Sequence, residues 1–175
     1  MWQERSGYVN SYVLGMMFEM DVLASLRCLD FGKTFIPRWL YSKELGRKTQ
    51  TDMVFVTKYC VYSIEVKSAR RLSGNIDDSR WWSSAPNTSK PIGIVNPYLQ
   101  NMHHIMSMKL HLYRDGLSYI PFENILVIKD NTVLKSDCDN FYTLSELRRK
   151  LVEDYKANSA KPDLIDVNRI YKVLK

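Results

Sequence analysis

The sequence predicts an α/β fold: one domain in which a central β-sheet is flanked by helices. Two neighbouring runs rich in strand-forming residues, 51–57 and 60–67, predict the middle of the sheet. Apolar residues recur at spacings of three and four over about 13–28, which predicts a helix before these strands. Asn96 and Pro97, a favoured N-cap and a favoured first helical residue, predict a helix after them.

The flanking segments complete this outline. The run 33–41 is apolar but contains Pro37, so we expect a short strand at a sheet edge. Residues 68–95 are rich in glycine, proline, asparagine and aspartate and predict a long irregular loop. The remaining elements are predicted to be a buried strand at 125–128, a helix that starts in a capping box at 143–146 and runs to about 157, and a short helix at 166–174.

Composition limits the protein class. A chain of 175 residues that is 45% hydrophobic and 25% charged suits one folded domain, and it contains no apolar stretch of membrane-spanning length. The first residues lack the basic start and apolar run of a signal peptide. Three cysteines without a CxxC pair argue against a disulfide framework or a zinc ribbon, so we expect reduced thiols in a cytoplasmic protein. The net charge of +6 favours nucleic acid as a partner, but only weakly.

An acidic pair is predicted on the central hairpin. Glu65 and Lys67 are two residues apart on a strand and therefore share a face. A turn at Lys58 and Tyr59 places Asp52 directly opposite Glu65, where two carboxylates repel each other. A divalent cation would reverse the sign of that interaction. The alternative is a salt-bridged patch in which Lys67 neutralises both carboxylates.

The same residues suit a particular chemistry. Mg²⁺ or Mn²⁺ is typically held by one or two carboxylates together with waters and substrate phosphates. A lysine beside such an ion could orient the attacking water or stabilise the charge that develops on phosphorus. Together these groups predict phosphodiester hydrolysis.

Several short motifs occur in a recognisable order along the chain. They are Thr49-Gln50-Thr51-Asp52, Tyr62-Ser63-Ile64-Glu65-Val66-Lys67, a segment from Gly74 to Trp82, and Asn96-Pro97-Tyr98-Leu99-Gln100-Asn101. This set resembles the PD-(D/E)xK nuclease superfamily and, more closely, its nuclease-related domain (NERD) family. The resemblance covers about residues 12–135. It implies a restriction-endonuclease-like core with a central mixed sheet in a single domain, 1–175, whose C-terminal helices occupy 143–175.

The resemblance also implies a role for each site residue. Asp52 and Glu65 would bind the metal ion, Lys67 would be the catalytic lysine, and Gln100 would assist from its helix. Glu19 would approach from the first helix as a further ligand, although Phe18 stands where the family usually has glycine. The proline of the superfamily's name is also missing before Asp52.

Two further groups of residues have competing interpretations. Arg70, Arg71, Arg80 and Lys90 flank a pair of tryptophans, a combination that suits nucleic-acid binding. The alternative is that the basic residues are merely solvated and that the tryptophans, Trp82 in particular, are at least partly structural.

The helix after Asn96 has two predicted sides. We expect its buried stripe to be Leu99, Met102, Met106, Leu110 and Tyr113. Gln100, His104, Ser107 and His111 lie on another side, and for the two histidines we favour a solvated face over a phosphate-contacting wall. The histidines have no HExxH spacing, so we expect no zinc site.

Taken together, the sequence favours a divalent-metal-dependent nuclease with DNA as the preferred substrate. A homodimer is compatible with a nuclease that cuts two strands, and no membrane partner is expected. Two alternatives stay open: a non-catalytic nucleic-acid-binding module and a protein-interaction module, each on a nuclease scaffold. Metal-dependent cleavage that is lost on Lys67→Ala would distinguish the enzyme from both.

Overall fold

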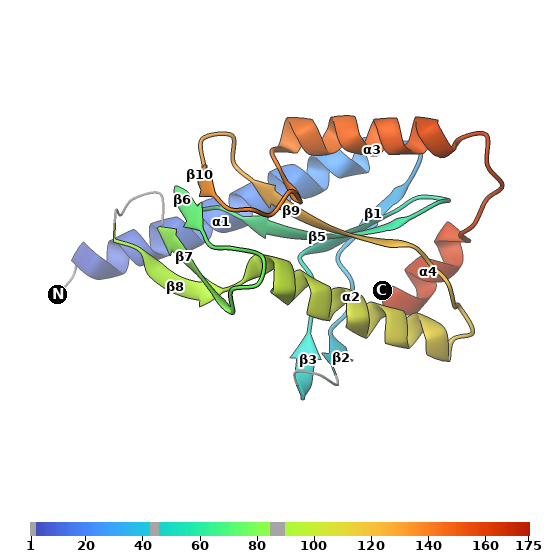
Figure 1. Cartoon of the computed structure of the whole chain (residues 1–175), viewed down its shortest axis with the longest axis horizontal. Coiled ribbons are helices and arrows are strands. Elements are labelled where there is room, and N and C mark those ends of the chain that lie inside the picture. The colour runs from blue at the N-terminus through green and yellow to red at the C-terminus, as the bar shows by residue number, and fades with distance from the viewer. Residues whose placement is uncertain (1–2, 43–45, 85–89) are drawn as a thin grey trace.

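The computed structural model describes residues 3–42, 46–84 and 90–175 (Figure 1). In chain order the elements are α1 (Gln3–Arg27), β1 (Lys33–Phe35), β2 (Leu40–Ser42), β3 (Arg47–Thr49), β4 (Met53–Val56), β5 (Val61–Lys67), β6 (Arg71–Ser73), β7 (Arg80–Ser84), β8 (Ile92–Val95), α2 (Pro97–Arg114), β9 (Phe122–Ile128), β10 (Val133–Lys135), β11 (Phe141–Tyr142), α3 (Leu144–Asn158) and α4 (Val167–Leu174).

The main sheet is mixed and has the strand order β1-β4-β5-β9-β11. β1 and β5 each run antiparallel to β4, whereas β9 runs parallel to both β5 and β11. The α/β prediction is therefore confirmed, with helices on both faces of a central mixed sheet (Figure 1).

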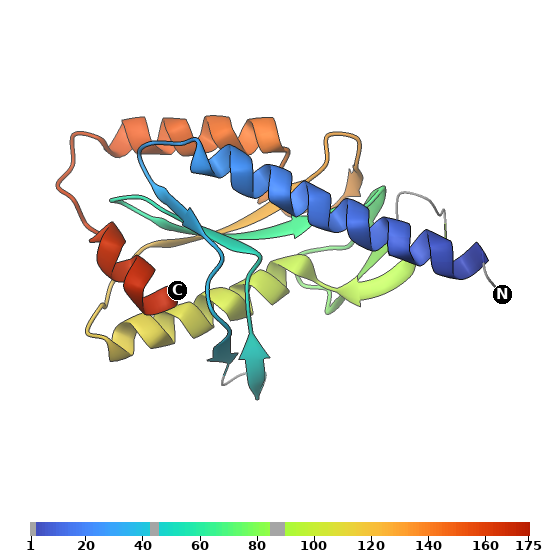
Figure 2. The same cartoon turned by 180° about the vertical axis from the view of Figure 1, so that it is seen from behind.

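Alternating side chains on the strands divide the core into two layers. Tyr62, Ile64 and Val66 of β5 pack toward α1 and α3, where Leu26 and Leu147 are fully buried. The opposite face packs against α2 and α4, as Figure 2 shows from behind. Because β5 alternates in this way, Ser63, Glu65 and Lys67 face α2.

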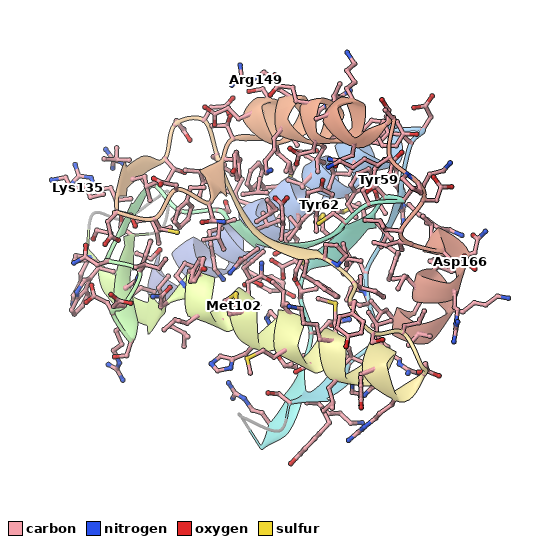
Figure 3. The ribbon with its side chains drawn as sticks, turned by 45° about the vertical axis from the view of Figure 1, so that its right-hand side comes forward. Tyr59, Tyr62, Met102, Lys135, Arg149 and Asp166 are labelled. Atoms are coloured by element: carbon pink, nitrogen blue, oxygen red, sulfur yellow. The ribbon has the colours of Figure 1, made fainter. Side chains whose placement is uncertain are left out.

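The helix α3 covers the first of these layers along the whole hairpin. Figure 3 shows Tyr59 and Tyr62 between the sheet and α3, and Arg149 on the outer side of that helix. The hydroxyl of Tyr62 donates to Asp154 of α3 at 3.1 Å, and the ring of Tyr59 lies 5.7 Å from that of Tyr155.

The turn between β4 and β5 lies at Lys58 and Tyr59, as predicted. Thr57 N–H donates to the Cys60 carbonyl at 3.0 Å, and the Thr57 hydroxyl accepts from the backbone N–H groups of Tyr59 and Cys60. These side-chain hydrogen bonds stabilise a turn whose two central residues are not ones that favour it. The pairing ends at Met53 opposite Ile64, and Asp52 and Glu65 are the next residues along the two segments.

The segment 68–95 is not the irregular loop that we expected. It contains β6, β7 and β8, which join β10 in a second sheet of order β10-β6-β7-β8; residues 85–89 lie outside the described part. Trp81 is fully buried between this sheet and β9, and a Cβ on Gly74 would come within 2.4 Å of its ring. The strands are short, and polar residues predominate in β6 and β7, so these segments lack the apolar runs that predict strands.

Other expectations need smaller corrections. The run 33–41 is two strands rather than one: β1 is the predicted edge strand, but β2 turns away after Pro37 and pairs with β3. α1 is longer than predicted and extends beyond the main sheet (Figure 2). Trp82 is 55% exposed, so Trp81, and not Trp82, is the structural tryptophan. Among the described helices, none combines the length and the apolar character needed to cross a membrane.

The helix α2 begins as predicted, with Asn96 as N-cap and Pro97 in its first turn, and ends at Asp115. Its predicted apolar stripe is wrong, since Tyr113 is 69% exposed and Met106 is 43% exposed. The buried residues are Pro97, Asn101, His104, Ile105, Ser107, Met108 and Leu112. The first half of the helix buries polar groups because it packs against the polar part of β5, and only its second half packs on the apolar core.

Candidate active site

The acidic pair occupies the ends of two antiparallel strands. Glu65 lies near the carboxyl end of β5 and is only 2% exposed. Asp52 directly precedes β4, and its Oδ2 accepts a hydrogen bond from the backbone N–H of Val66 at 2.7 Å. The hairpin register thus brings the two carboxylates together, as the sequence predicted.

Three side chains contact Glu65. Lys67 Nζ lies 2.6 Å from Glu65 Oε1, and Gln100 Nε2 donates to the same oxygen at 2.7 Å. His104 Nε2 lies 3.6 Å from the other oxygen, Oε2, which is longer than a full hydrogen bond. Lys67 Nζ also lies 3.4 Å from Gln100 Oε1, so the lysine, the glutamine and the carboxylate form one connected cluster.

Electrostatics distinguishes the two carboxylates. Burial, and then the charge of Glu65, raises the pKa of Asp52 to about 7. Burial also opposes ionisation of Glu65, but contacts with His104 and Lys67 outweigh it and hold the pKa of Glu65 below its usual value. Lys67 therefore stabilises Glu65 but leaves Asp52 poorly compensated. This argues against the alternative of a patch in which one lysine neutralises both acids.

Glu19 faces this cluster from the middle of α1. Burial, and then repulsion by Glu65, raises its pKa above the usual range, while Lys67 acts in the opposite direction. Its charge also contributes to the raised pKa of Asp52. Three carboxylates thus share the field of one lysine, which leaves the site with an excess of negative charge.

These residues fit a hard divalent cation. Oε2 of Glu65 is buried and accepts no hydrogen bond within the described part of the chain, so one carboxylate oxygen still lacks a partner. Among the described residues, no group of three histidine, cysteine, aspartate or glutamate side chains is close enough to hold a metal ion. An ion here would therefore rest on Asp52 and Glu65 and complete its shell with waters and substrate oxygens, as Mg²⁺ commonly does.

The position of Gln100 is set by buried asparagines on α2. Asn96 Oδ1 accepts from Tyr98 N–H at the start of the helix, and its Nδ2 donates to the carbonyl groups of Ile76 and Asp78, at 2.8 Å each. Asn101 anchors the helix to the sheet through Ser63, beside Gln100. The first turn of α2 is thereby fixed over β5, and Gln100 reaches Glu65.

His104 was missed as a site residue and is not on a solvated face. It is 5% exposed, and its Nδ1 lies 2.6 Å from the Thr49 hydroxyl oxygen. The available signal was its spacing from Gln100, since residues four apart share one side of a helix. His111 differs: it is half-buried, and its ring bonds to the carbonyl of Ser107 within the same helix.

The four predicted nucleic-acid-binding residues are exposed and lie on the second sheet. Arg71 begins β6 and Arg80 begins β7, whereas Arg70 precedes β6 and Lys90 lies between β7 and β8. Because Arg71 pairs with Ser84, at the other end of β7 from Arg80, the basic side chains are spread over the sheet. They lie beyond the carboxyl end of β5, close to the acidic cluster in the chain (Figure 1).

Comparison with known families agrees with the motifs seen at this site. The sequence profile of the nuclease-related domain, NERD, matches residues 14–129. The chain belongs to the nuclease-related domain family. No curated protein matches it. The matched region contains the NERD motif positions discussed above and ends just after β9, before α3 and α4.

Several NERD motif residues have structural roles that surround the acidic cluster. Gln50 donates to the Pro37 carbonyl, which ties the β3–β4 connection to the segment after β1. The Thr51 hydroxyl donates to the Ile64 carbonyl at 3.0 Å and holds the residue before Asp52 against β5. The motif therefore includes residues that hold the scaffold as well as residues of the acidic cluster.

Proposed function

We propose that this NERD-family protein is a divalent-metal-dependent nuclease that hydrolyses phosphodiester bonds, with DNA as its substrate. The observation that carries the proposal is the cluster at the end of β5. There Lys67 Nζ and Gln100 Nε2 donate hydrogen bonds to Glu65 Oε1 at 2.6 Å and 2.7 Å. Asp52, whose pKa is raised to about 7, lies beside them. Membership of a nuclease-related family supports the reaction class.

Asp52 and Glu65 are the proposed ligands of Mg²⁺ or Mn²⁺, and Glu19 adds negative charge beside them. When bound, such an ion polarises a phosphate oxygen and lowers the pKa of a coordinated water. Its charge would also relieve the repulsion that raises the pKa of Asp52.

Lys67 and Gln100 are the proposed polar groups for the reaction itself. Lys67 is 23% exposed, so its ammonium can meet both Glu65 and an incoming phosphate. In hydrolysis the water oxygen bonds to phosphorus as the bond to the leaving sugar oxygen breaks, and negative charge builds on the phosphoryl oxygens. A preorganised ammonium beside those oxygens stabilises that charge, and Gln100 holds the side chains of Lys67 and Glu65 in position.

Cleavage assays test this proposal directly. Single-stranded, duplex and circular DNA are incubated with protein in Mg²⁺, in Mn²⁺ and in EDTA, and RNA is included as a competing substrate. We expect cleavage of DNA only with a divalent ion, and a loss of at least about 100-fold on Lys67→Met. The matched control is Lys48→Met, an exposed lysine on β3, which should cleave at the wild-type rate.

Two results would count against catalysis. Metal-independent loss of substrate would indicate a contaminant or a different chemistry. Salt-sensitive DNA binding without cleavage of any substrate, unchanged by Lys67→Met, would identify a non-catalytic binding module on the nuclease scaffold.

A further inference from the structure

The buried imidazole of His104 lies between Thr49 of β3 and Glu65 of β5, beside the acidic cluster. Thr49, at the end of β3, contacts its Nδ1 at 2.6 Å, and Glu65 of β5 faces its Nε2 at 3.6 Å. All three side chains are buried, with exposed fractions of 7%, 5% and 2% for Thr49, His104 and Glu65. Within the described residues, neither His104 Nε2 nor Glu65 Oε2 makes a hydrogen bond. The two atoms face each other at 3.6 Å.

We propose that His104 is a positioning residue for the Glu65 carboxylate, and that Thr49 selects the imidazole tautomer that performs this role. The inference rests on the proposed function only where it treats Glu65 as a metal ligand. The contact itself stands on geometry.

The neutral imidazole can meet the Thr49 hydroxyl in two arrangements. If Nδ1 carries the proton, it donates to the Thr49 hydroxyl, and the lone pair of Nε2 then faces a carboxylate oxygen in a buried space. That arrangement leaves two acceptors opposed with no donor between them. If Thr49 donates to Nδ1 instead, Nε2–H points at Glu65 Oε2, and a small closure from 3.6 Å completes a hydrogen bond.

The second arrangement also accounts for the acceptor positions of Glu65. A carboxylate offers about four acceptor sites on its two oxygens. Lys67 and Gln100 occupy two of them on Oε1, and His104 takes one on Oε2. One site on Oε2 is left, so a carboxylate held by three donors can still bind a cation without turning.

The reverse tautomer would give His104 a different role. With Nδ1 protonated, the Nε2 lone pair would be available as a direct metal ligand beside Glu65 Oε2. The tautomer of the metal-free protein therefore separates a positioning residue from a ligand.

Nuclear magnetic resonance of the metal-free protein tests the tautomer. Long-range ¹H–¹⁵N correlations of the imidazole show which nitrogen carries the proton. We expect His104 protonated at Nε2 and unprotonated at Nδ1, with an Nε2 resonance that moves on Glu65→Gln. Protonation at Nδ1, or no response to Glu65→Gln, would overturn the proposal.

Mn²⁺ titration of two isosteric variants tests the consequence. His104→Gln keeps an amide nitrogen at the Nε2 position, whereas His104→Asn keeps one only at the Nδ1 position. We expect His104→Asn to weaken Mn²⁺ binding by about 10–100-fold, as removal of an outer partner of a metal ligand typically does. His104→Gln should retain most of the affinity, and His111→Gln, on the same helix, should match wild type.

Equal losses of Mn²⁺ affinity in His104→Gln and His104→Asn would overturn the positioning role, because they would indicate that the ring binds the metal directly or acts by packing. Thr49→Val keeps the imidazole ring and removes only its hydroxyl partner. This variant therefore provides the test if His104→Asn fails to fold. Thr49→Val should populate the Nδ1-protonated tautomer and weaken Mn²⁺ binding, whereas Thr49→Ser should restore the Nε2-protonated tautomer and the wild-type affinity. A wild-type protein that binds no Mn²⁺ would instead reject the proposed metal site, and the metal-free spectra would still decide the His104–Glu65 contact.

Discussion

Asn101 on α2 donates from Nδ2 to the carbonyl oxygen of Ser63 on β5 at 2.8 Å, while its Oδ1 accepts from the Ser63 hydroxyl at 2.6 Å. The same amide donates to Asn124 Oδ1 at 2.8 Å, and the Asn124 amide bonds in turn to the Tyr98 carbonyl at 3.0 Å. A fully buried network therefore joins the helix that carries Gln100 to the two central parallel strands. Stability and site geometry depend on the same side chain.

Replacing Asn101 by alanine should destabilise the protein substantially. The change would remove the donor to the buried Asn124 Oδ1 and one of the two acceptors of the Ser63 hydroxyl, and each unsatisfied buried group costs about 1–3 kcal/mol. We expect a loss of about 3 kcal/mol in the free energy of unfolding, measured by urea denaturation. Asn168→Ala, at an exposed position on α4, should change it by less than about 0.5 kcal/mol. Equal effects of the two substitutions would show that the network is not what fixes α2.

The raised pKa of Asp52 predicts a pH-dependent stability difference. Because the pKa is about 7 in the folded state and near 3.8 otherwise, the folded protein binds more protons between these values. The contribution of Asp52 is therefore fully present below about pH 4 and is lost as the pH rises through about 7. Asp52→Asn does not lose stability in this way as the pH rises. Without divalent ions the variant should therefore be more stable than wild type at pH 8, by on the order of 2 kcal/mol.

The measurement is the difference in unfolding free energy between Asp52→Asn and wild type across pH 4–8, in EDTA. The difference should grow with pH and then level off above about pH 7. Asp77→Asn, an exposed aspartate between β6 and β7, provides the control. A flat profile for Asp52→Asn would mean that folding does not raise the pKa of Asp52.

Divalent ions should stabilise the wild-type protein in a pH-dependent manner. A cation at Asp52 and Glu65 competes with the proton on Asp52, so its effect should increase from pH 6 to pH 8. Each tenfold excess of ion over its dissociation constant adds about 1.4 kcal/mol, or roughly 3–6 °C in Tm for a chain of this length. Differential scanning calorimetry with Mn²⁺, against KCl at matched ionic strength, measures this shift. A shift that persists in Asp52→Asn would place the ion elsewhere.

Some of these features could be predicted from sequence because they depend on local rules. Strand alternation placed Glu65 and Lys67 on one face, and the two-residue turn placed Asp52 opposite Glu65. The N-cap at Asn96 and the capping box at Thr143 are likewise local, and both are confirmed.

The features that were missed depend on partners distant in the chain. His104 is buried because Thr49, 55 residues away, and Glu65 surround it, and no helical periodicity encodes that. β7 is a strand because Trp81 fills the space beside β9, although Arg80, Ser83 and Ser84 are polar and Arg80 and Trp82 are exposed. Buried polar residues look like surface residues in a one-dimensional pattern, so His104 was expected on a solvated face although it is buried.

The exposed arginines of the second sheet predict a specific salt dependence of DNA binding. Each phosphate contact made by a lysine or arginine releases condensed counterions and adds about 0.9 to the slope of log K against log salt. Arg71→Gln combined with Arg80→Gln should therefore lower the magnitude of that slope by about two. Trp82→Ala should weaken binding to single strands more than to duplexes, because an exposed indole stacks only on unpaired bases.

Fluorescence anisotropy with labelled oligonucleotides at several KCl concentrations measures both effects, in EDTA so that no cleavage occurs. Arg149→Gln is the matched control, since Arg149 lies on the outer side of α3 (Figure 3) and should leave the slope unchanged. An equal decrease for Arg149→Gln would show that binding follows net charge alone. The second sheet would then have no special part in holding the substrate beside Asp52 and Glu65.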